Sequence, residues 1–150
     1  MNWDHEERKK KLMEYADRDA ELNGKAGASI FETEFIDYDE DNVVTVRFHI
    51  KDWQRNPFGN LQGGMQCYFL DFIAGIASWV MVDGEPIGTV DLNVNFIRTV
   101  PQTAEFVDVR AQVISLGRRV IVAHAEVRDP DGWLAADAVA NTTRLLGTDP

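Results

Sequence analysis

The alternation of apolar and polar residues changes period along the chain and predicts a series of elements. Residues 4–22 place their apolar side chains on one face of a helix, which Asp4 can cap at the start and Asn23-Gly24 can end. Alternation with period two then predicts strands over residues 30–36 and 44–50, each with one apolar face.

The stretch 62–82 returns to helical spacing, and its apolar residues cover nearly every side, which is typical of a helix buried in a core. An apolar run of this length is also typical of a membrane span. We reject the membrane interpretation because polar residues such as Gln66 and Ser78 interrupt the run, no basic residues flank it, and strands with period two surround it. A membrane is therefore not an expected partner.

Four more strands are expected in the second half of the chain, because period-two alternation resumes after a turn at 83–86. Hairpin-type turns join the last three, and we expect the four to form an antiparallel series. An antiparallel sheet curled around the apolar helix buries both, which predicts an α+β fold. The predicted strands span residues 87–97, 104–115, 119–128 and 133–145.

Composition and charge fit an ordinary globular domain. The 150 residues are enough for one domain with an apolar core, and 45% of them are hydrophobic. A net charge of −10 argues against nucleic acid as a partner, because phosphate backbones require a basic surface. The single cysteine, Cys67, excludes an internal disulfide. The charged N-terminal residues do not resemble a secretory signal, so a cytoplasmic location is expected.

Asp71 is the first candidate for chemistry, because it is the only charged residue between Gln62 and Val82. A carboxylate is costly in apolar surroundings unless it is paired or functional. Asp71 is therefore either a general base, or a residue on a solvent-exposed stripe of the helix, or a residue tied to a backbone donor. These alternatives stay open at this point.

Gly63 and Gly64 open the same helix, where backbone N–H groups have no helical partner and carry the positive end of the helix dipole. Glycine lets a ligand oxygen approach these donors, so the pair could polarise a carbonyl; the alternative is simple loop flexibility. Asp71 lies eight residues beyond Gly63, roughly 12 Å along the axis. If both act on one substrate, they must come from different subunits, which predicts a dimer.

Other kinds of site find little support. The chain has no Gly-x-Ser-x-Gly segment, no phosphate loop and no dinucleotide fingerprint, and its three histidines lack the spacing of metal ligands. No metal or cofactor is therefore expected.

Three segments together resemble the hotdog-fold acyl-CoA thioesterases of the phenylacetic acid degradation type. They are Asn56–Gly64 (NPFGNLQGG), Asp71, and Gly88–Val94 (GTVDLNV). The similarity extends over about residues 43–145. It implies a hotdog fold, in which an antiparallel sheet wraps around one long central helix. Residues 1–150 would then form a single domain with an N-terminal helical extension over 1–29.

The resemblance also implies roles for single residues. Asn56 and Gly63 would bind and polarise the thioester carbonyl, Asp71 would act as general base or nucleophile, and Thr89 would place the attacking water. In this family the asparagine and glycine come from one subunit and the acid from its partner. The dimers commonly pair again into tetramers, so a homodimer or a dimer of dimers is expected.

One position departs from the family, which usually has His-Gly-Gly where this chain has Gln62-Gly63-Gly64. Glutamine still forms hydrogen bonds but cannot become a cation near neutral pH. The backbone donor of Gly63 does not depend on it, and we expect Gln62 and Gly64 to contact the substrate.

Further candidates for substrate contacts are arginines and aromatic residues. Arg98, Arg118 and Arg119 lie at expected strand ends or turns and could bind coenzyme A phosphates, or they form an ordinary solvated rim. The aromatic candidates line an acyl pocket or pack in the core. They are Trp53, Phe58 and Tyr68.

These inferences favour an acyl-CoA thioesterase that hydrolyses an acyl- or aryl-CoA to the free acid and coenzyme A. A thiol with a pKa of about 8.5 leaves without a strong general acid, so one carboxylate and a polarised carbonyl suffice. The alternatives are a hotdog protein that binds acyl-CoA or another acyl ligand without turnover, a structural oligomerising domain, and a hydratase on the same fold.

Overall fold

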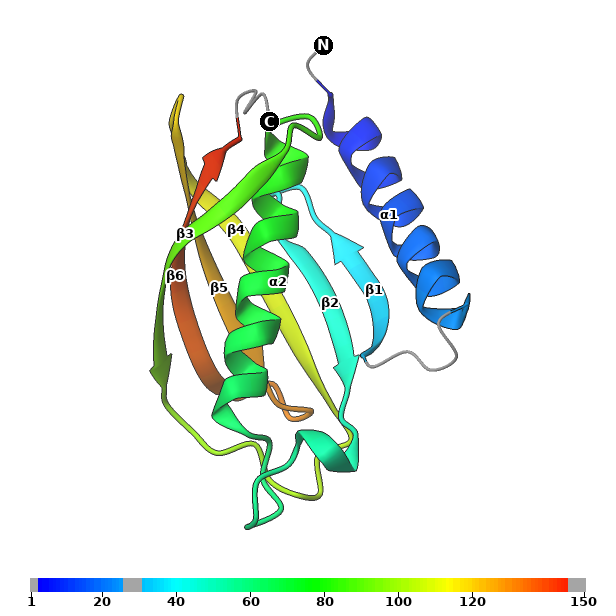
Figure 1. The fold of residues 1–150 in the computed structure, drawn as a ribbon, viewed down its shortest axis with the longest axis vertical. Helices are drawn as coiled ribbons and strands as arrows, with labels where there is room; N and C mark the ends of the chain where they lie inside the picture. The colour runs from blue at the N-terminus through cyan, green and yellow to red at the C-terminus, as the bar shows by residue number, and fades with distance from the viewer. Residues whose placement is uncertain (1–2, 26–30, 146–150) are drawn as a thin grey trace.

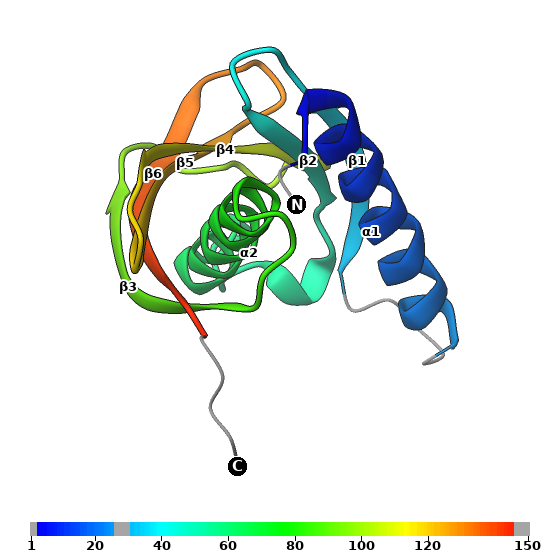
Figure 2. The ribbon, with the colours of Figure 1, turned by 90° about the horizontal axis from the view of Figure 1, so that it is seen from above.

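An antiparallel sheet curls around one long helix, and a second helix lies beside the sheet (Figure 1, Figure 2). The structure is a computed structural model that describes residues 3–25 and 31–145, with the backbone alone for 18–25. In chain order the elements are α1 (His5–Lys25), β1 (Glu32–Tyr38), β2 (Val44–His49), the short 3-10 helix η1 (Asp52–Gln54), α2 (Gly63–Met81), β3 (Ile87–Phe96), β4 (Phe106–Leu116), β5 (Val120–Arg128) and β6 (Leu134–Arg144).

This arrangement confirms the predicted α+β architecture, with every expected helix and strand present. The strand expected over residues 30–36 begins outside the described part of the chain, and β1 continues to Tyr38. Part of the expected extension over residues 1–29 also lies outside the described residues.

The order of the strands in the sheet differs from the expected series. The order is β1-β2-β4-β5-β6-β3, so β3 pairs with β6 at one edge and β4 pairs with β2 in the middle. The reason lies in residues 97–105, which cross below the start of α2 instead of forming a tight turn (Figure 1). Among the last four strands, the β4–β5 and β5–β6 connections are hairpins, as their turn residues predicted, whereas the β3–β4 connection is not.

Helix α1 begins as predicted, but it ends later. The N–H of Glu7 donates to Asp4 Oδ1 at 2.9 Å, and the Asp4 N–H donates to Glu7 Oε2 at 3.4 Å, which caps the first turn. The predicted end at Asn23-Gly24 is wrong, since the backbone stays helical through both residues to Lys25. Helix ends are the least sharply coded part of an element.

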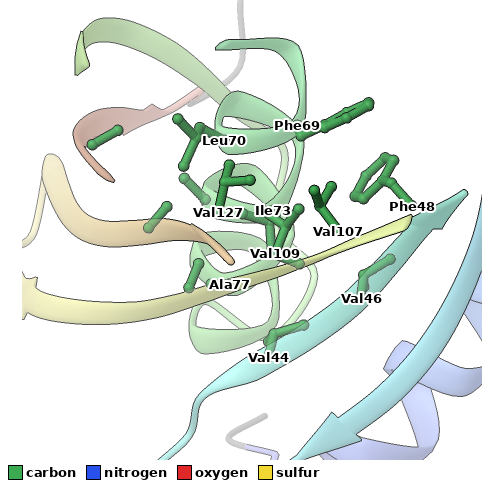
Figure 3. Packing of buried hydrophobic residues seen from close by; sticks show 14 of the residues in the cluster. Val44, Val46, Phe48, Phe69, Leu70, Ile73, Ala77, Val107, Val109 and Val127 are labelled. Carbon is green, nitrogen blue, oxygen red and sulfur yellow. The ribbon is translucent and has the colours of Figure 1, made fainter. Parts of the chain in front are cut away.

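The core lies between α2 and the concave face of the sheet (Figure 3). Phe69, Leu70 and Ile73 are fully buried against valines of β2, β4 and β5, and fully or almost fully buried alanines on β5 and β6 let the helix approach closely. Helix α2 is long and apolar enough to cross a membrane by length and composition. Its buried side chains pack on the sheet, which curls around the helix (Figure 2).

Candidate active site

Asp71 and Thr89 form a direct contact between α2 and β3. The Thr89 hydroxyl donates to Asp71 Oδ1 at 2.8 Å. The second carboxylate oxygen, Oδ2, accepts no hydrogen bond within residues 3–25 and 31–145. Asp71 is therefore neither tied to a backbone donor nor fully exposed on a solvent stripe, because its side chain is half-buried and held by one hydroxyl.

A β-bulge turns Thr89 toward the helix. The sequence pattern placed Thr89 on the face opposite Leu92, but the register skips a residue between Thr89 and Asp91. Thr89 therefore pairs with the buried Thr142 on the concave side, and Val90 is left 65% exposed on the outside. Strict alternation has no signal for such a bulge, so only the family resemblance indicates a role for the Thr89 hydroxyl.

Asp71 and Thr89 lie at the polar end of an open cleft of about 300 Å³. The rest of the cleft is mainly apolar and is formed by α1, α2 and the beginning of β3. The other lining residues are Tyr15, Phe72, Gly75, Ile76, Trp79, Ile87 and Gly88. We call it the carboxylate cleft.

A second cleft, of about 290 Å³, contains Asn56 and Gly63. The loop before α2 fixes the Asn56 side chain, because Asn56 Oδ1 accepts hydrogen bonds from the N–H groups of Phe58 at 3.0 Å and Asn60 at 3.1 Å. With the oxygen held in this way, the Nδ2 amide group remains as a donor. We call this space the amide cleft.

The N-terminus of α2 supplies a further donor to the amide cleft through Gly63, whereas Gln62 and Gly64 do not line the cleft. The N–H groups of Gly63 and Gly64 have no acceptor within the described part of the chain, and the exposed side chain of Gln62 makes no capping hydrogen bond. A Cβ on Gly63 would lie 3.2 Å from the ring of Phe96, whereas Gly64 has no atom within 4 Å of that position.

Gln66 also lines the amide cleft, and the sequence pattern did not single it out as a site residue. Its side chain is 4% exposed, and its Oε1 is buried without a hydrogen-bond partner among residues 3–25 and 31–145. The pattern counted Gln66 only as an interruption of an apolar run. Its spacing of three residues after Gly63, on the same side of the first helical turns, is the signal that would have indicated it.

The candidate residues therefore form two pairs in one chain. Asn56 lies with Gly63, and Asp71 lies with Thr89, but α2 separates the two pairs by roughly 12 Å. One chain alone does not bring all four together.

The three candidate arginines also lie apart in one chain, near opposite ends of β6. Arg98 lines the amide cleft, and its guanidinium group lies over the ring of Trp133 at 4.6 Å. Arg118 and Arg119 are exposed in the β4–β5 turn, near the other end of β6. The Ala135 carbonyl accepts from the Arg98 N–H, and the Arg144 N–H donates to the Arg119 carbonyl. Ala135 and Arg144 are nine strand positions apart, which corresponds to roughly 30 Å.

The three aromatic candidates line neither cleft. Phe58 does not pack in the core either, because it is 84% exposed, so the core-packing alternative is wrong for this residue. Phe31 stacks on Tyr68 with ring centroids 4.1 Å apart and meets Trp53 edge-on at 5.6 Å. The aromatic rings of Tyr68 and Trp53 thus belong to a surface cluster around β1.

Comparison with protein families identifies the chain. Residues 58–136 match the family model described as thioesterase superfamily, and this span covers more than half of the sequence. The chain belongs to the thioesterase superfamily. It is a thioester hydrolase, and the resemblance stated from its sequence motifs is confirmed. No curated protein matches the thioesterase significantly.

Solved structures show the same fold. A thioesterase from Haemophilus influenzae superposes with a TM-score of 0.73 at 21% identity, over 100% of this thioesterase and 97% of that chain. A putative thioesterase from Ralstonia eutropha, described as phenylacetic acid degradation-related, has 27% identity and a TM-score of 0.66, over 82% and 89% of the two chains. A Streptococcus mutans protein bound to acetyl CoA has 18% identity and a TM-score of 0.68, over 75% and 88%.

Proposed function

We propose that the thioesterase hydrolyses an acyl-CoA at a site made by two subunits, with the carboxylate cleft of one chain facing the amide cleft of the other. The observation that carries the proposal is the division of the site residues between two clefts. Asp71, held by the Thr89 hydroxyl, lies in one cleft, and the amide donors of Asn56 and Gly63 lie in the other. The helix α2 keeps Asp71 and Gly63 apart. The acetyl CoA bound by the Streptococcus mutans protein supports coenzyme A as the leaving group.

The chemistry follows from these groups. The thioester carbonyl oxygen accepts hydrogen bonds from the Gly63 N–H and from Asn56 Nδ2, which stabilise the negative charge that develops on it. Asp71 takes a proton from a water molecule, whose oxygen forms the new bond to the carbonyl carbon. The C–S bond then breaks and the thiolate takes up the proton that Asp71 removed from the water, which gives the free acid and coenzyme A and restores the Asp71 carboxylate.

Thr89 acts as a positioning residue in this scheme. Its hydroxyl occupies Asp71 Oδ1 at 2.8 Å, which leaves Oδ2 directed to the water. A carboxylate that kept several rotamers would spend part of its time out of line with the nucleophile.

The direction of β3 supports the arrangement across a two-fold axis. Thr89 near its start contacts Asp71, and Phe96 at its end packs against Gly63. β3 is an edge strand, and Val90 and Phe96 are 65% and 57% exposed on it. Antiparallel pairing of two β3 strands about their middle places the start of one beside the end of the other, and hence the carboxylate cleft beside Gly63 of the partner subunit.

The same pairing brings arginines from both chains to each site. Arg98 lies at the Phe96 end of β3, and the turn with Arg118 and Arg119 lies at the Thr89 end, because Val120 and Thr89 pair with neighbouring residues of β6. Arginines suit the phosphates of coenzyme A because their guanidinium groups bind two oxygens at once. In this proposal each coenzyme A meets arginines of both subunits.

Complementation between two inactive variants tests the proposal. Asp71→Asn and Gly63→Ala chains are each expected to lose hydrolysis as homodimers. When they are unfolded, mixed in equal amounts and refolded, half of the dimers are mixed and one of their two sites is intact, so activity recovers to about a quarter of wild type.

The control is a mixture of Asp71→Asn and Thr89→Ala chains, whose changes lie in the same cleft. In that mixed dimer each site carries one of the two changes, because Asp71 and Thr89 of a site come from the same chain. No intact site forms, so we expect no activity above the mean of the two parent variants. Formation of mixed dimers is verified by mass spectrometry of the native complex. If Asp71→Asn and Gly63→Ala form mixed dimers that recover no activity, the shared site is contradicted. If the wild-type protein binds acyl-CoA but releases no thiol, the protein is a binding protein instead.

A further inference from the structure

A narrow apolar slot lies beneath α1, between this helix, the strands β1 and β2, and α2. Its walls include Leu12 and Ala16 from α1 and Phe35 and Val46 from the strands. The space inside is about 20 Å³, which is room for one water-sized group. The slot is therefore nearly closed.

The slot and the carboxylate cleft share walls. Tyr15, Phe72 and Ile76 line both, so the slot continues the cleft inward from the Asp71 end toward α1. Tyr15 lies where the two meet, and its ring is 5.8 Å from that of Trp79. An apolar path thus runs from the carboxylate to the inner side of α1.

Gly75 forms the floor of this path. It follows Asp71 by four residues and so lies one turn further along the same face of α2. A Cβ at Gly75 would meet no atom within 4 Å. The missing side chain leaves a notch in the helix surface next to the carboxylate.

The two clefts differ in character, and this difference orients a substrate. Asn56, Gln66 and Arg98 make the amide cleft polar, which suits the coenzyme A side of the thioester. Beyond Asp71 and Thr89 the carboxylate cleft is apolar, which suits the acyl side. Burial of an acyl chain in the carboxylate cleft removes apolar surface of both the acyl chain and the protein from water.

We infer that the acyl group of the substrate extends from Asp71 over Gly75 and ends against Tyr15, so that α1 limits the acyl chain to medium length. This inference rests on the proposed function. From Asp71 to Ile76 the helix rises roughly 7.5 Å, and an extended carbon chain advances roughly 1.3 Å per bond, so the path holds about six carbon atoms. The substrate class is a straight, apolar acyl-CoA of about that length.

Two variants change the path in opposite directions. Gly75→Met fills the notch, and we expect it to lower kcat/KM for hexanoyl-CoA about tenfold relative to acetyl-CoA. Tyr15→Ala opens the far end, and we expect it to move the preferred chain toward decanoyl-CoA. In the wild type, kcat/KM should rise about fourfold per added methylene up to about six carbons and then level off or fall.

Matched controls separate these effects from loss of fold. Gly75→Ala adds one methyl group to the path, so it should shift the chain-length profile less than Gly75→Met does, with an unchanged or higher Tm. Met13 lies on α1 like Tyr15, is 51% exposed, and lines neither the slot nor the carboxylate cleft. Met13→Ala should therefore leave the chain-length profile unchanged.

Thiol release is measured for each variant over saturated acyl-CoAs from two to sixteen carbons. Opposite shifts in Gly75→Met and Tyr15→Ala support the inference. A profile that both variants leave unchanged, in a protein that hydrolyses acyl-CoA, overturns the inference alone. A wild-type protein that releases thiol from none of the acyl-CoAs overturns the proposed function itself, which is a different result.

Discussion

Adding one methyl group to Gly63 tests the carbonyl-binding role of the α2 N-terminus most directly. The new Cβ of Gly63→Ala would lie 3.2 Å from Phe96 Cζ and 3.3 Å from Cε1. The Phe96 ring is 57% exposed and can move by the few tenths of an ångström that this contact requires. The methyl group stands beside the Gly63 N–H, where a ligand oxygen has to approach.

The expected magnitudes separate folding from catalysis. Alanine favours a helix over glycine by about 1 kcal/mol in the interior and by less at the first helical residue, so the free energy of unfolding should change by less than about 1 kcal/mol. The loss of one donor to the developing oxyanion lowers kcat by about 10²–10³-fold, which corresponds to about 2.7–4 kcal/mol. Gly63→Ala should therefore keep its Tm within a few degrees and lose at least about 10²-fold in kcat.

Gly64→Ala is the matched control, since a Cβ there meets nothing within 4 Å. We expect it to retain activity within a few-fold of wild type. Thermal melts followed by circular dichroism give Tm, and thiol release from hexanoyl-CoA gives kcat. Equal losses in the two variants, or full activity in Gly63→Ala, would refute the reasoning.

Two further predictions concern hydroxyl groups. Thr89→Ala removes the hydrogen bond to Asp71, and we expect it to lower kcat about tenfold. Asp71→Asn removes the general base, and we expect it to lower kcat about 10²–10⁴-fold. Equal losses of kcat in steady-state measurements of the two variants would contradict the positioning role of Thr89. Burial raises the pKa of Tyr38 above 10.0, so stability from the neutral phenol is present below about pH 10 and is lost as pH rises through the raised pKa. Tyr38→Phe should thus show a shallower fall of Tm between about pH 9 and 11, and an unchanged slope would show that another group causes that fall.

Much of the fold was predictable because its elements carry strong periodic signals. The stretch 62–82 is apolar on nearly every side and forms the central helix, and Asp4 caps α1 as predicted. The place of β3 was not predictable in this way. Pairing between strands distant in sequence depends on where a long connection such as 97–105 runs, and periodicity says nothing about that.

Part of the site was also predictable, because some of its residues stand out in the local sequence. The isolated charge of Asp71 and the two glycines at a helix start stand out in a linear sequence, and helix geometry gave their separation. Thr89 faces Asp71 only because of a bulge, and Gln66 matters only because its amide oxygen is buried beside the amide cleft. Both depend on packing between elements, which no local pattern encodes.

Strand β4 joins the two halves of the sheet, since it pairs with β2 on one side and with β5 on the other. The hairpins β4–β5 and β5–β6 link neighbours in sequence, whereas the pairing of β2 with β4 has to close a loop that contains α2 and β3. A nascent chain that has emerged from the ribosome only as far as β3 therefore carries the apolar α2 without the strands that cover it. Synthesis of the last third of the chain supplies the strands β4, β5 and β6 that cover the apolar side chains of α2.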